Sequence, residues 1–248
     1  MQPLHARLKI SQEDLLKQIH DLYWNQKLSQ NAIAQYFQCH ITTIENIFRK
    51  GLVVSRTNQE ACRNTKENHC KINQKQKDIL NGLLLSDFHI EKGTFQARLS
   101  FGFKHKEFAE LCMRELNCFQ WYKLSQAKTT GCWHSKTAFY KELFDLRNVW
   151  YPEGVKIVPD IKLSKESIMY WFLGDGMKDK RGHGAIFCCE SFNIKDNLKL
   201  SNMLNKINIK NHLTPSNRIR ISGQKGFKSL IEFIGDSPIE CYKYKFKL

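Results

Sequence analysis

Leu80-Asn81-Gly82-Leu83-Leu84-Leu85-Ser86-Asp87 is the first of two similar segments in this chain. The second is Met169-Tyr170-Trp171-Phe172-Leu173-Gly174-Asp175-Gly176. Each is an apolar run typical of a buried helix, and each reaches one carboxylate. A single run of this kind is common where a buried helix meets its capping turn. Here the two acids are 88 positions apart, about the length of one small α/β unit. The pair therefore predicts a duplicated unit that presents Asp87 and Asp175 at a central seam, where they are suited to hold a divalent metal for phosphodiester chemistry.

The composition points to a polyanionic partner. The chain has 248 residues, enough for one mid-sized domain and a small one, and its 42% hydrophobic content supports a sizeable core. Its formal net charge is +15 and its pI is about 9.4. No segment reads as a basic amphipathic helix, and no apolar run approaches the roughly 18 residues of a membrane span. We therefore expect nucleic acid as the partner, and no membrane.

The cysteines indicate free thiols. There are nine, an odd number, and no Cys-x-x-Cys pair occurs among them. Cys62, His69 and Cys70 lie close together but lack a second ligand pair at zinc-finger spacing. The first ten residues contain no apolar core of a secretion signal. We expect an intracellular protein in a reducing compartment, either a bacterial or phage-infected cytoplasm or an organelle matrix.

Residues 11–50 predict three short amphipathic helices and no strand. Ser29 is a plausible N-cap of the second helix, and the third opens at Thr42 or Thr43. This stretch resembles a helix-turn-helix module, which places its second helix in the DNA major groove. A trihelical module for protein interaction is the alternative. The resemblance implies that five side chains face phosphates or base edges: His40, Thr42, Thr43, Asn46 and Arg49.

The domain organisation follows from changes in composition. We predict a helical module over residues 1–53, a basic linker over 54–76, and two related subdomains over 77–155 and 156–248. The linker is rich in Asn, Lys, Gln and Thr, which suits either a solvated tether or a segment that lies along a DNA groove.

The two subdomains repeat one order of elements. In the first, a strand over 95–103 is followed by a helix over 106–116, a hairpin over 120–133 and a helix over 138–149. In the second, a strand over 185–191 is followed by a helix over 194–207, a hairpin over 213–222 and a helix from about residue 225. Polar residues alternate with apolar ones in both, which predicts a DNA-binding face that carries Gln96, Arg98, Ser100, Arg218, Arg220 and Ser222.

Five segments resemble the LAGLIDADG homing endonucleases with two motifs in one chain, in the order in which they occur along the sequence. Residues 82–87 and 170–176 are similar to the two motifs, and residues 150–159 are similar to the family segment between the halves. Ser191-Phe192 and Tyr242-Lys243 are similar to later segments. The resemblance covers about residues 78–248, and the family pattern does not extend to the N-terminal helices.

The resemblance implies an α+β fold, a pseudo-twofold duplicated αββαββα arrangement preceded here by a small all-α domain. Two saddle-shaped sheets would grip double-stranded DNA at a long specific site. Asp87 and Asp175 would bind Mg²⁺, for which Mn²⁺ would substitute. Lys156 and Lys243 would be a pair of basic residues near the attacking water. The monomer would cut both strands with 3′ overhangs, the activity that underlies intron mobility.

Two positions depart from the family pattern. Phe88 follows the first acid where a small residue is usual, and Tyr170 stands at the position equivalent to Gly82. We therefore expect the interface between the motif helices to be asymmetric or slightly opened. Two other functions remain open: an RNA-splicing maturase that binds intron RNA, and a DNA-binding regulator without catalysis. The presence of both acids and both lysines argues against the regulator.

Overall fold

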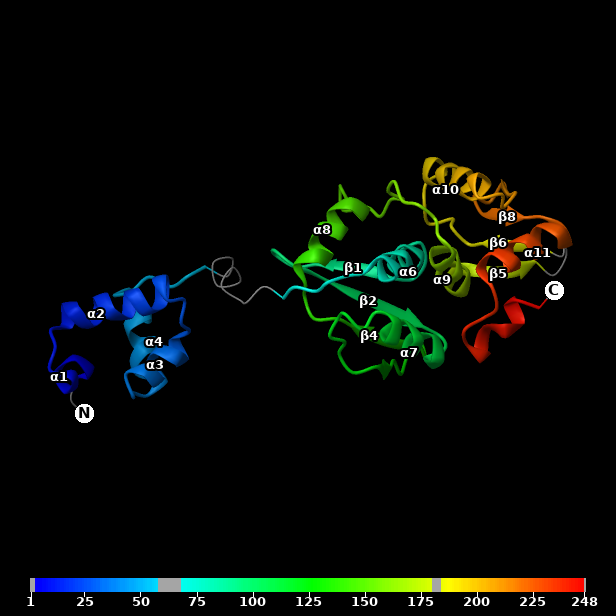
Figure 1. Cartoon of the computed structure of the whole chain (residues 1–248). Helices are drawn as coiled ribbons and strands as arrows, with labels where there is room; N and C mark the ends of the chain where they lie inside the picture. The colour runs from blue at the N-terminus through cyan, green and yellow to red at the C-terminus, as the bar shows by residue number, and fades with distance from the viewer. Residues whose placement is uncertain (1–2, 58–67, 180–183, 248) are drawn as a thin grey trace. The chain divides into compact units, whose positions relative to one another are not determined.

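The computed structural model describes residues 3–57, 68–179 and 184–247. Contacts within the chain divide it into two compact units, residues 1–66 and 67–248 (Figure 1). Each unit has a hydrophobic core of its own. The two subdomains predicted over residues 77–155 and 156–248 therefore share one core and form a single unit.

The first unit is all-helical, and it contains the three predicted helices. Ser29 caps the second of them, because its hydroxyl accepts a hydrogen bond from the backbone N–H of Ala32. The third begins at Ile41, one residue earlier than predicted, because the ring of His40 serves as its N-cap. A short additional helix precedes them. The elements are α1 (Leu4–Leu8), α2 (Gln12–His20), a π-helical turn η1 (Asp21–Asn25), α3 (Gln30–Tyr36) and α4 (Ile41–Arg49).

The predicted linker, residues 54–76, is too long at both ends. The indole N–H of Trp24 donates to the carbonyl of Val54, which attaches the start of this segment to the first unit. At the other end, the side chain of Asn68 donates to the carbonyl of Phe139, and the ring of His69 contacts Glu142 in the second unit. The middle of the segment, residues 58–67 with Cys62, lies outside the described residues.

The second unit confirms the predicted αββαββα duplication. Each half contains a motif helix, two hairpins and two further helices, and each half forms a four-stranded antiparallel sheet, in the orders β1-β2-β4-β3 and β5-β6-β8-β7. The first half comprises α6 (Gln74–Leu84), β1 (His89–Lys92), β2 (Ala97–Phe103), α7 (Lys106–Glu115), β3 (Ser125–Gln126), β4 (Trp133–Lys136) and α8 (Lys141–Trp150). The second comprises α9 (Lys165–Asp175), β5 (Gly176–Asp179), β6 (Gly184–Phe187), α10 (Ile194–Lys206), β7 (His212–Leu213), β8 (Ile219–Ile221) and α11 (Gly223–Ile234), followed by a 3₁₀ helix, η2 (Glu240–Lys245).

The motif helices α6 and α9 pack directly against each other at the seam between the halves (Figure 1). The approach is close enough that a Cβ atom on Gly82 would lie 2.2 Å from the carbonyl oxygen of Ser167, and one on Gly174 would lie 2.5 Å from the hydroxyl of Ser86. The interface is therefore not opened. Ser86 and Gly174 meet at equivalent positions, each immediately before its acid. The interface is asymmetric at Gly82, which meets Ser167 instead of its equivalent, Tyr170.

The two departures from the family pattern are accommodated in different places. Tyr170, on α9 of the second half, is buried near Cys112 and Glu115 of α7 in the first half. The ring of Phe88 stacks on Phe101 and Phe103 of β2, with centroids 5.3 and 5.8 Å apart. Phe88 thus contributes to the core of the first half, and Tyr170 contributes an aromatic ring between the halves.

Substituting Gly82 by alanine should destabilise the protein by about 3 kcal/mol. The added methyl group would collide with backbone atoms of Ser167, which cannot move aside as a flexible side chain can. Chemical denaturation monitored by circular dichroism measures this. The matched control is Gly226→Ala in α11, where the nearest atom is a side-chain methyl of Ile221 at 3.0 Å, which can shift. Equal stability of the two variants would contradict the close approach of α6 and α9.

Candidate active site

Asp87 and Asp175 lie at the C-terminal ends of the two motif helices, as predicted. Asp175 is the last residue of α9, and Asp87 follows α6 in the turn that leads to β1. The backbone N–H of Cys188 donates to the carbonyl of Asp175 at 2.9 Å, which ties the end of α9 to the end of β6. Asp87 is exposed and Asp175 is half-buried. Because α6 and α9 are packed together, both carboxylates belong to one site.

The surroundings of both acids disfavour their charge. Burial, with a further contribution from the negative charge of Asp87, raises the pKa of Asp175 to about 7. Burial also raises the pKa of Asp87, although Lys156 and Lys245 counteract it. Two neighbouring carboxylates in a partly dehydrated site favour either the binding of a cation or the protonation of one of the acids.

Two lysines complete the site, one beside each acid; Lys245 is buried and Lys156 is half-buried. The Lys156 ammonium donates to the carbonyls of Ser86 at 3.0 Å and Phe88 at 2.9 Å, on either side of Asp87. The Lys245 ammonium donates to the carbonyl of Leu173 at 2.7 Å, close to Asp175. Burial lowers the pKa of both lysines to about 8, even though both acids act in the opposite direction.

The structure places Lys245, and not Lys243 of the predicted pair, beside the acids. Lys243 is exposed and forms an ion pair with Glu240 at 2.5 Å, whereas Lys245 is buried and reaches the end of α9. The sequence offered no way to choose between them, because residues 242–245 read Tyr-Lys-Tyr-Lys. The ring of Tyr242, which is buried, lies 4.3 Å from the Lys245 ammonium, so the two side chains pack together in the site.

The segment that carries Lys245 is held by the other half of the unit. Both carboxylate oxygens of Glu107, on α7, accept backbone hydrogen bonds from the first turn of η2, from Glu240 at 2.8 Å and from Cys241 at 3.1 Å. A carboxylate at this position satisfies free N–H groups at the start of a helix. Glu107 therefore positions Lys245 without reaching the acids itself.

For the DNA cleavage that the resemblance implies, replacing Glu107 by glutamine should reduce the rate about tenfold and leave DNA affinity nearly unchanged. One of the two accepting oxygens is replaced by an NH2 group, which cannot accept a hydrogen bond, so η2 is held less firmly. Single-turnover cleavage rates and binding constants, measured separately, distinguish the two effects. Glu110→Gln on the same helix is the control, since Glu110 forms only an exposed pair with Lys106. Equal rates for the two variants would remove Glu107 from any positioning role.

The donor set fits a hard divalent cation that is shared with a substrate. Among the described residues, no cluster of three or more His, Cys, Asp or Glu side chains is arranged as a metal cage. Burial raises the pKa of both acids, and the negative charge of Asp87 raises that of Asp175 further, so a cation bound between them would favour their charged forms. Mg²⁺ is commonly held by one or two carboxylates together with substrate phosphates and waters. Asp87 and Asp175 match that pattern.

The outer face of the first sheet is polar, as predicted, but its charges are paired. Ser100 stands opposite His89 on one side and Lys136 on the other. Arg98 stands opposite Glu91 and forms an ion pair with it at 2.7 Å. Burial opposes the charge of Glu91, yet hydrogen bonds from Lys136 and Arg98 hold its pKa at about 2. Gln96, just before β2, is half-buried.

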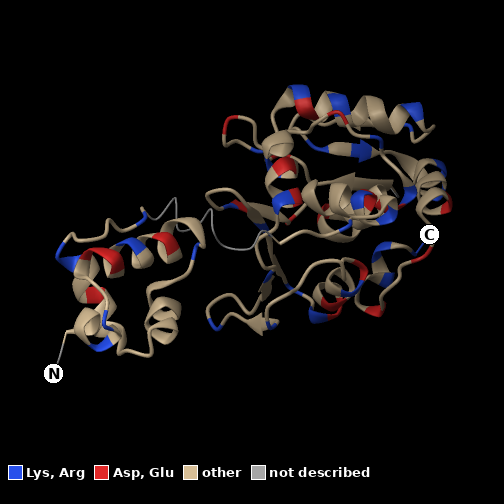
Figure 2. Cartoon of the chain, turned by 60° about the vertical axis from the view of Figure 1, so that its left-hand side comes forward, with Lys and Arg blue, Asp and Glu red and all other residues tan. Residues whose placement is uncertain are grey.

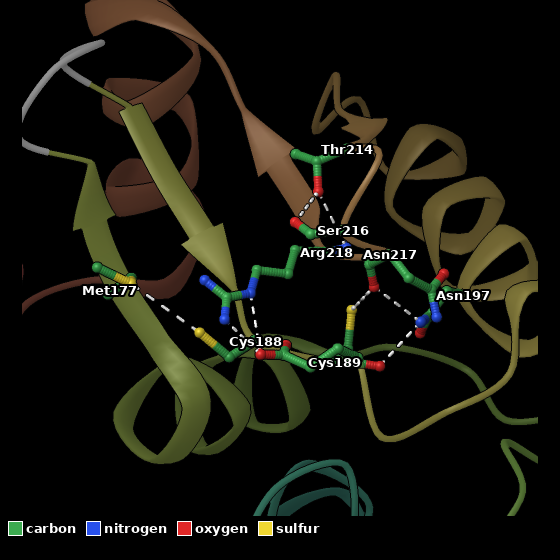
Figure 3. Close-up of polar contacts among 9 residues, drawn as sticks. Met177, Cys188, Cys189, Asn197, Thr214, Ser216, Asn217 and Arg218 are labelled. Atoms are coloured by element: carbon green, nitrogen blue, oxygen red, sulfur yellow. Dashed lines mark hydrogen bonds and ion pairs between the residues drawn. The ribbon is translucent and has the colours of Figure 1, made fainter.

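The second sheet repeats this pairing. The guanidinium of Arg218 donates to Glu190, with its Nε at 2.9 Å from the carboxylate (Figure 3). Arg220 pairs with Asp179, a largely buried carboxylate. Ser222 is exposed at the start of α11. The predicted arginines thus lie on the expected faces, each oriented by a neighbouring acid, and their contact with DNA stays a prediction.

In the first unit, the side chains predicted to meet DNA lie along α4 and its N-terminus. His40, Thr42, Asn46 and Arg49 are exposed and Thr43 is half-buried. The guanidinium of Arg49 donates to the side chain of Asn46. Lysines and arginines occur on the helices of both units and on the strands of the second (Figure 2). The short turn between α3 and α4 is compatible with a helix-turn-helix, but DNA binding by this unit remains a prediction.

No helix in the part of the chain that the structure describes is both long and apolar enough to cross a lipid bilayer.

Comparison with known proteins gives matches of three kinds. The family described as "LAGLIDADG DNA endonuclease family" matches residues 77–227. An uncharacterized protein of Methanocaldococcus jannaschii is 24% identical over 197 residues, which cover 75% of this chain and 76% of that protein.

Among solved structures, the homing endonuclease I-WcaI bound to its DNA recognition sequence matches with a TM-score of 0.63 and 22% identity, over 81% of this chain and 98% of that chain. Full-length DUF199/WhiA from "Thermatoga maritima" matches with a TM-score of 0.47 and 10% identity, over 71% of this chain and 60% of that chain. The match to I-WcaI supports the fold described above.

Proposed function

Because the chain belongs to the LAGLIDADG DNA endonuclease family, we propose that it is a monomeric, site-specific endonuclease that cuts both strands of DNA. The observation that carries this proposal is the arrangement of two acids, the buried Lys245 and the half-buried Lys156 at the seam of the second unit. A non-catalytic DNA-binding protein would have no use for two ammonium groups drawn out of water beside two carboxylates, since their desolvation costs free energy.

Asp87 and Asp175 would hold the divalent metal, with Mg²⁺ as the ordinary ion and Mn²⁺ as a substitute. When bound, the metal would supply a water of lowered pKa and stabilise the oxygens of an in-line displacement. Lys156 and Lys245 would direct N–H donors at the phosphate as its charge develops. Because the pKa of both lysines is about 8, each can also release or take up a proton near neutral pH.

The surfaces beside this site suit a duplex. The net charge of +15 gives long-range attraction for phosphates. The outer faces of the two sheets carry side chains that can reach base edges, with Arg98 in the first half and Arg218 and Arg220 in the second. On binding, phosphates and bases would compete with the acids that orient these arginines. We therefore expect a long recognition site and a steep dependence of affinity on salt.

The test is a cleavage selection on a randomised duplex library in Mg²⁺. One long sequence cut on both strands, with 3′ overhangs at the ends, is the expected result. Specific binding without cutting would replace the proposal with a DNA-binding regulator. Binding to structured intron RNA in preference to every duplex would replace it with a maturase.

Removing residues 1–66 should shorten the footprint on the target and weaken binding about tenfold, while cleavage persists at high enzyme concentration. The reason is that a tethered second module adds affinity through effective concentration without taking part in chemistry. The deletion stops before Asn68, because Asn68 and His69 bond to the second unit. Footprinting and titration measure the effect. An unchanged footprint would show that the first unit does not bind the target.

A further inference from the structure

The two sheets share one topology but differ in the chemistry of their outer faces. In the first sheet, the outward residues of paired strands are polar: His89, Ser100 and Lys136 form one cross-strand row, and Glu91 and Arg98 form the next. Such a face offers hydrogen-bond donors and acceptors to base edges across its breadth.

The corresponding part of the second sheet is apolar. Met177 of β5 stands directly opposite Ile186 of β6. Cys188 follows two residues after Ile186, so it points to the same face, and its sulfur lies 3.9 Å from the sulfur of Met177 (Figure 3). Met177 is 43% exposed, and Ile186 and Cys188 are half-buried. We call these three residues the methyl patch.

The neighbours of the methyl patch favour DNA as its partner. On one side the backbone of Cys188 bonds to Asp175, so the patch adjoins one of the two acids. On the other side Ile186 stands opposite Arg220, and Arg218 pairs with Glu190 on the same face. The patch thus lies between the acid pair, which fits a metal, and two arginines. Such an apolar surface suits contact with the base edges in a major groove, with the arginines near phosphates or guanines.

We propose that the methyl patch contacts thymine 5-methyl groups in the half of the target beside Asp175; this inference rests on the proposed function. The 5-methyl of thymine is the apolar feature of the major groove, and uncharged side chains recognise it by contact. Burying one methyl group is worth about a fourfold change in affinity. The half of the target that faces the first sheet would instead be read by hydrogen bonds, so the two halves of the site follow different rules.

The experiment uses the full chain and a duplex recovered by the cleavage selection. Each thymine is replaced singly by uracil, which removes only the 5-methyl group, and affinity is measured by fluorescence anisotropy in EDTA so that no cleavage occurs. Wild-type protein should bind two- to tenfold more weakly when uracil stands at one or a few adjacent positions within one half. Met177→Ala and Ile186→Ala should abolish this preference. Leu198→Ala, an equally exposed apolar residue on α10 (49%), should retain it.

Two results would overturn the inference while the endonuclease stands: uracil tolerated at every position of a duplex that is cut, or a thymine preference that Met177→Ala and Ile186→Ala leave intact. The second result would assign the patch to a partner other than DNA. Failure to recover any cleaved duplex would be a different outcome, because it removes the proposed function together with this inference.

Discussion

Asp175→Asn should abolish double-strand cleavage, with a loss of about a thousandfold or more in rate, and should leave specific binding intact. The amide cannot supply the negative charge that a divalent cation requires, and a ligand lost from a metal site removes several kcal/mol of transition-state stabilisation. Single-turnover cleavage in Mg²⁺ and anisotropy in EDTA measure the two quantities. Asp87→Asn should have the same phenotype, because each acid stands at the end of its own motif helix.

The same substitution should stabilise the metal-free protein, with a defined dependence on pH. Burial raises the pKa of Asp175 to about 7 in the folded state from an ordinary value of 3.8. The folded protein therefore favours the protonated acid, and wild-type stability falls as pH rises from about 4 to 7. The neutral amide of Asp175→Asn carries no such penalty. Since Asp175 is only half-buried, we expect a gain of about 1 to 2 kcal/mol at pH 8 and almost none at pH 4.

Adding Mg²⁺ provides the control for this result. Wild-type protein should gain thermal stability from the metal at pH 8, because binding to the folded state stabilises it by mass action, and Asp175→Asn should gain far less. A variant that loses cleavage and also loses stability at pH 8 would show that Asp175 is a structural residue. Full cleavage by Asp175→Asn would eliminate the metal site assigned here.

Lys245→Met should reduce the cleavage rate about a hundredfold or more, whereas Lys243→Met should stay within about twofold of wild type. Lys245 is buried and donates to the carbonyls at the end of α9, beside Asp175. Lys243 is exposed and paired with Glu240. Because the two lysines are two positions apart in one short helix, Lys243→Met is a closely matched control for charge and location.

The stability of Lys245→Met separates a chemical role from a structural one. Burial lowers the pKa of Lys245 from 10.5 to about 8, so the folded state disfavours its charge, and this penalty is present below pH 8 and fades as pH rises toward 10.5. Methionine removes the penalty, so Lys245→Met should be at least as stable as wild type at pH 7. Equal cleavage losses in the two variants would return the role to Lys243, and unfolding of Lys245→Met would leave Lys245 structural only.

Much of the fold follows from short-range patterns. The motif helices were predicted because apolar residues recur within each run, and the strand over 95–103 because apolar and polar residues alternate along it. The structure forms β2 over 97–103, and its burial alternates accordingly. β1 and β5 were not predicted. Each is four residues long, with too few apolar positions to show alternation, and each is defined by its ladder to a neighbouring strand.

The position of the arginines was predicted more successfully than their environment. Alternation placed Arg98, Arg218 and Arg220 on the faces opposite the core, which the burial pattern of their strands confirms. Their partners could not be read from the sequence. Glu190 is 28 residues from Arg218 and Asp179 is 41 residues from Arg220, and only the registers and turns of the folded sheet bring them together.

Local sequence was sufficient to predict the duplication, the two helices that end on acids, the four-part order of each half and the basic charge. These features depend on residues that are neighbours along the chain. The pairing of Lys245, rather than Lys243, with Lys156 and the contact of Gly82 with the backbone of Ser167 arise only when the chain is folded. The physical reason is that the burial of a lysine or an acid, and with it the pKa, depends on groups that are distant in the sequence. The carbonyl of Leu173, which accepts a hydrogen bond from the Lys245 ammonium, is 72 residues from Lys245.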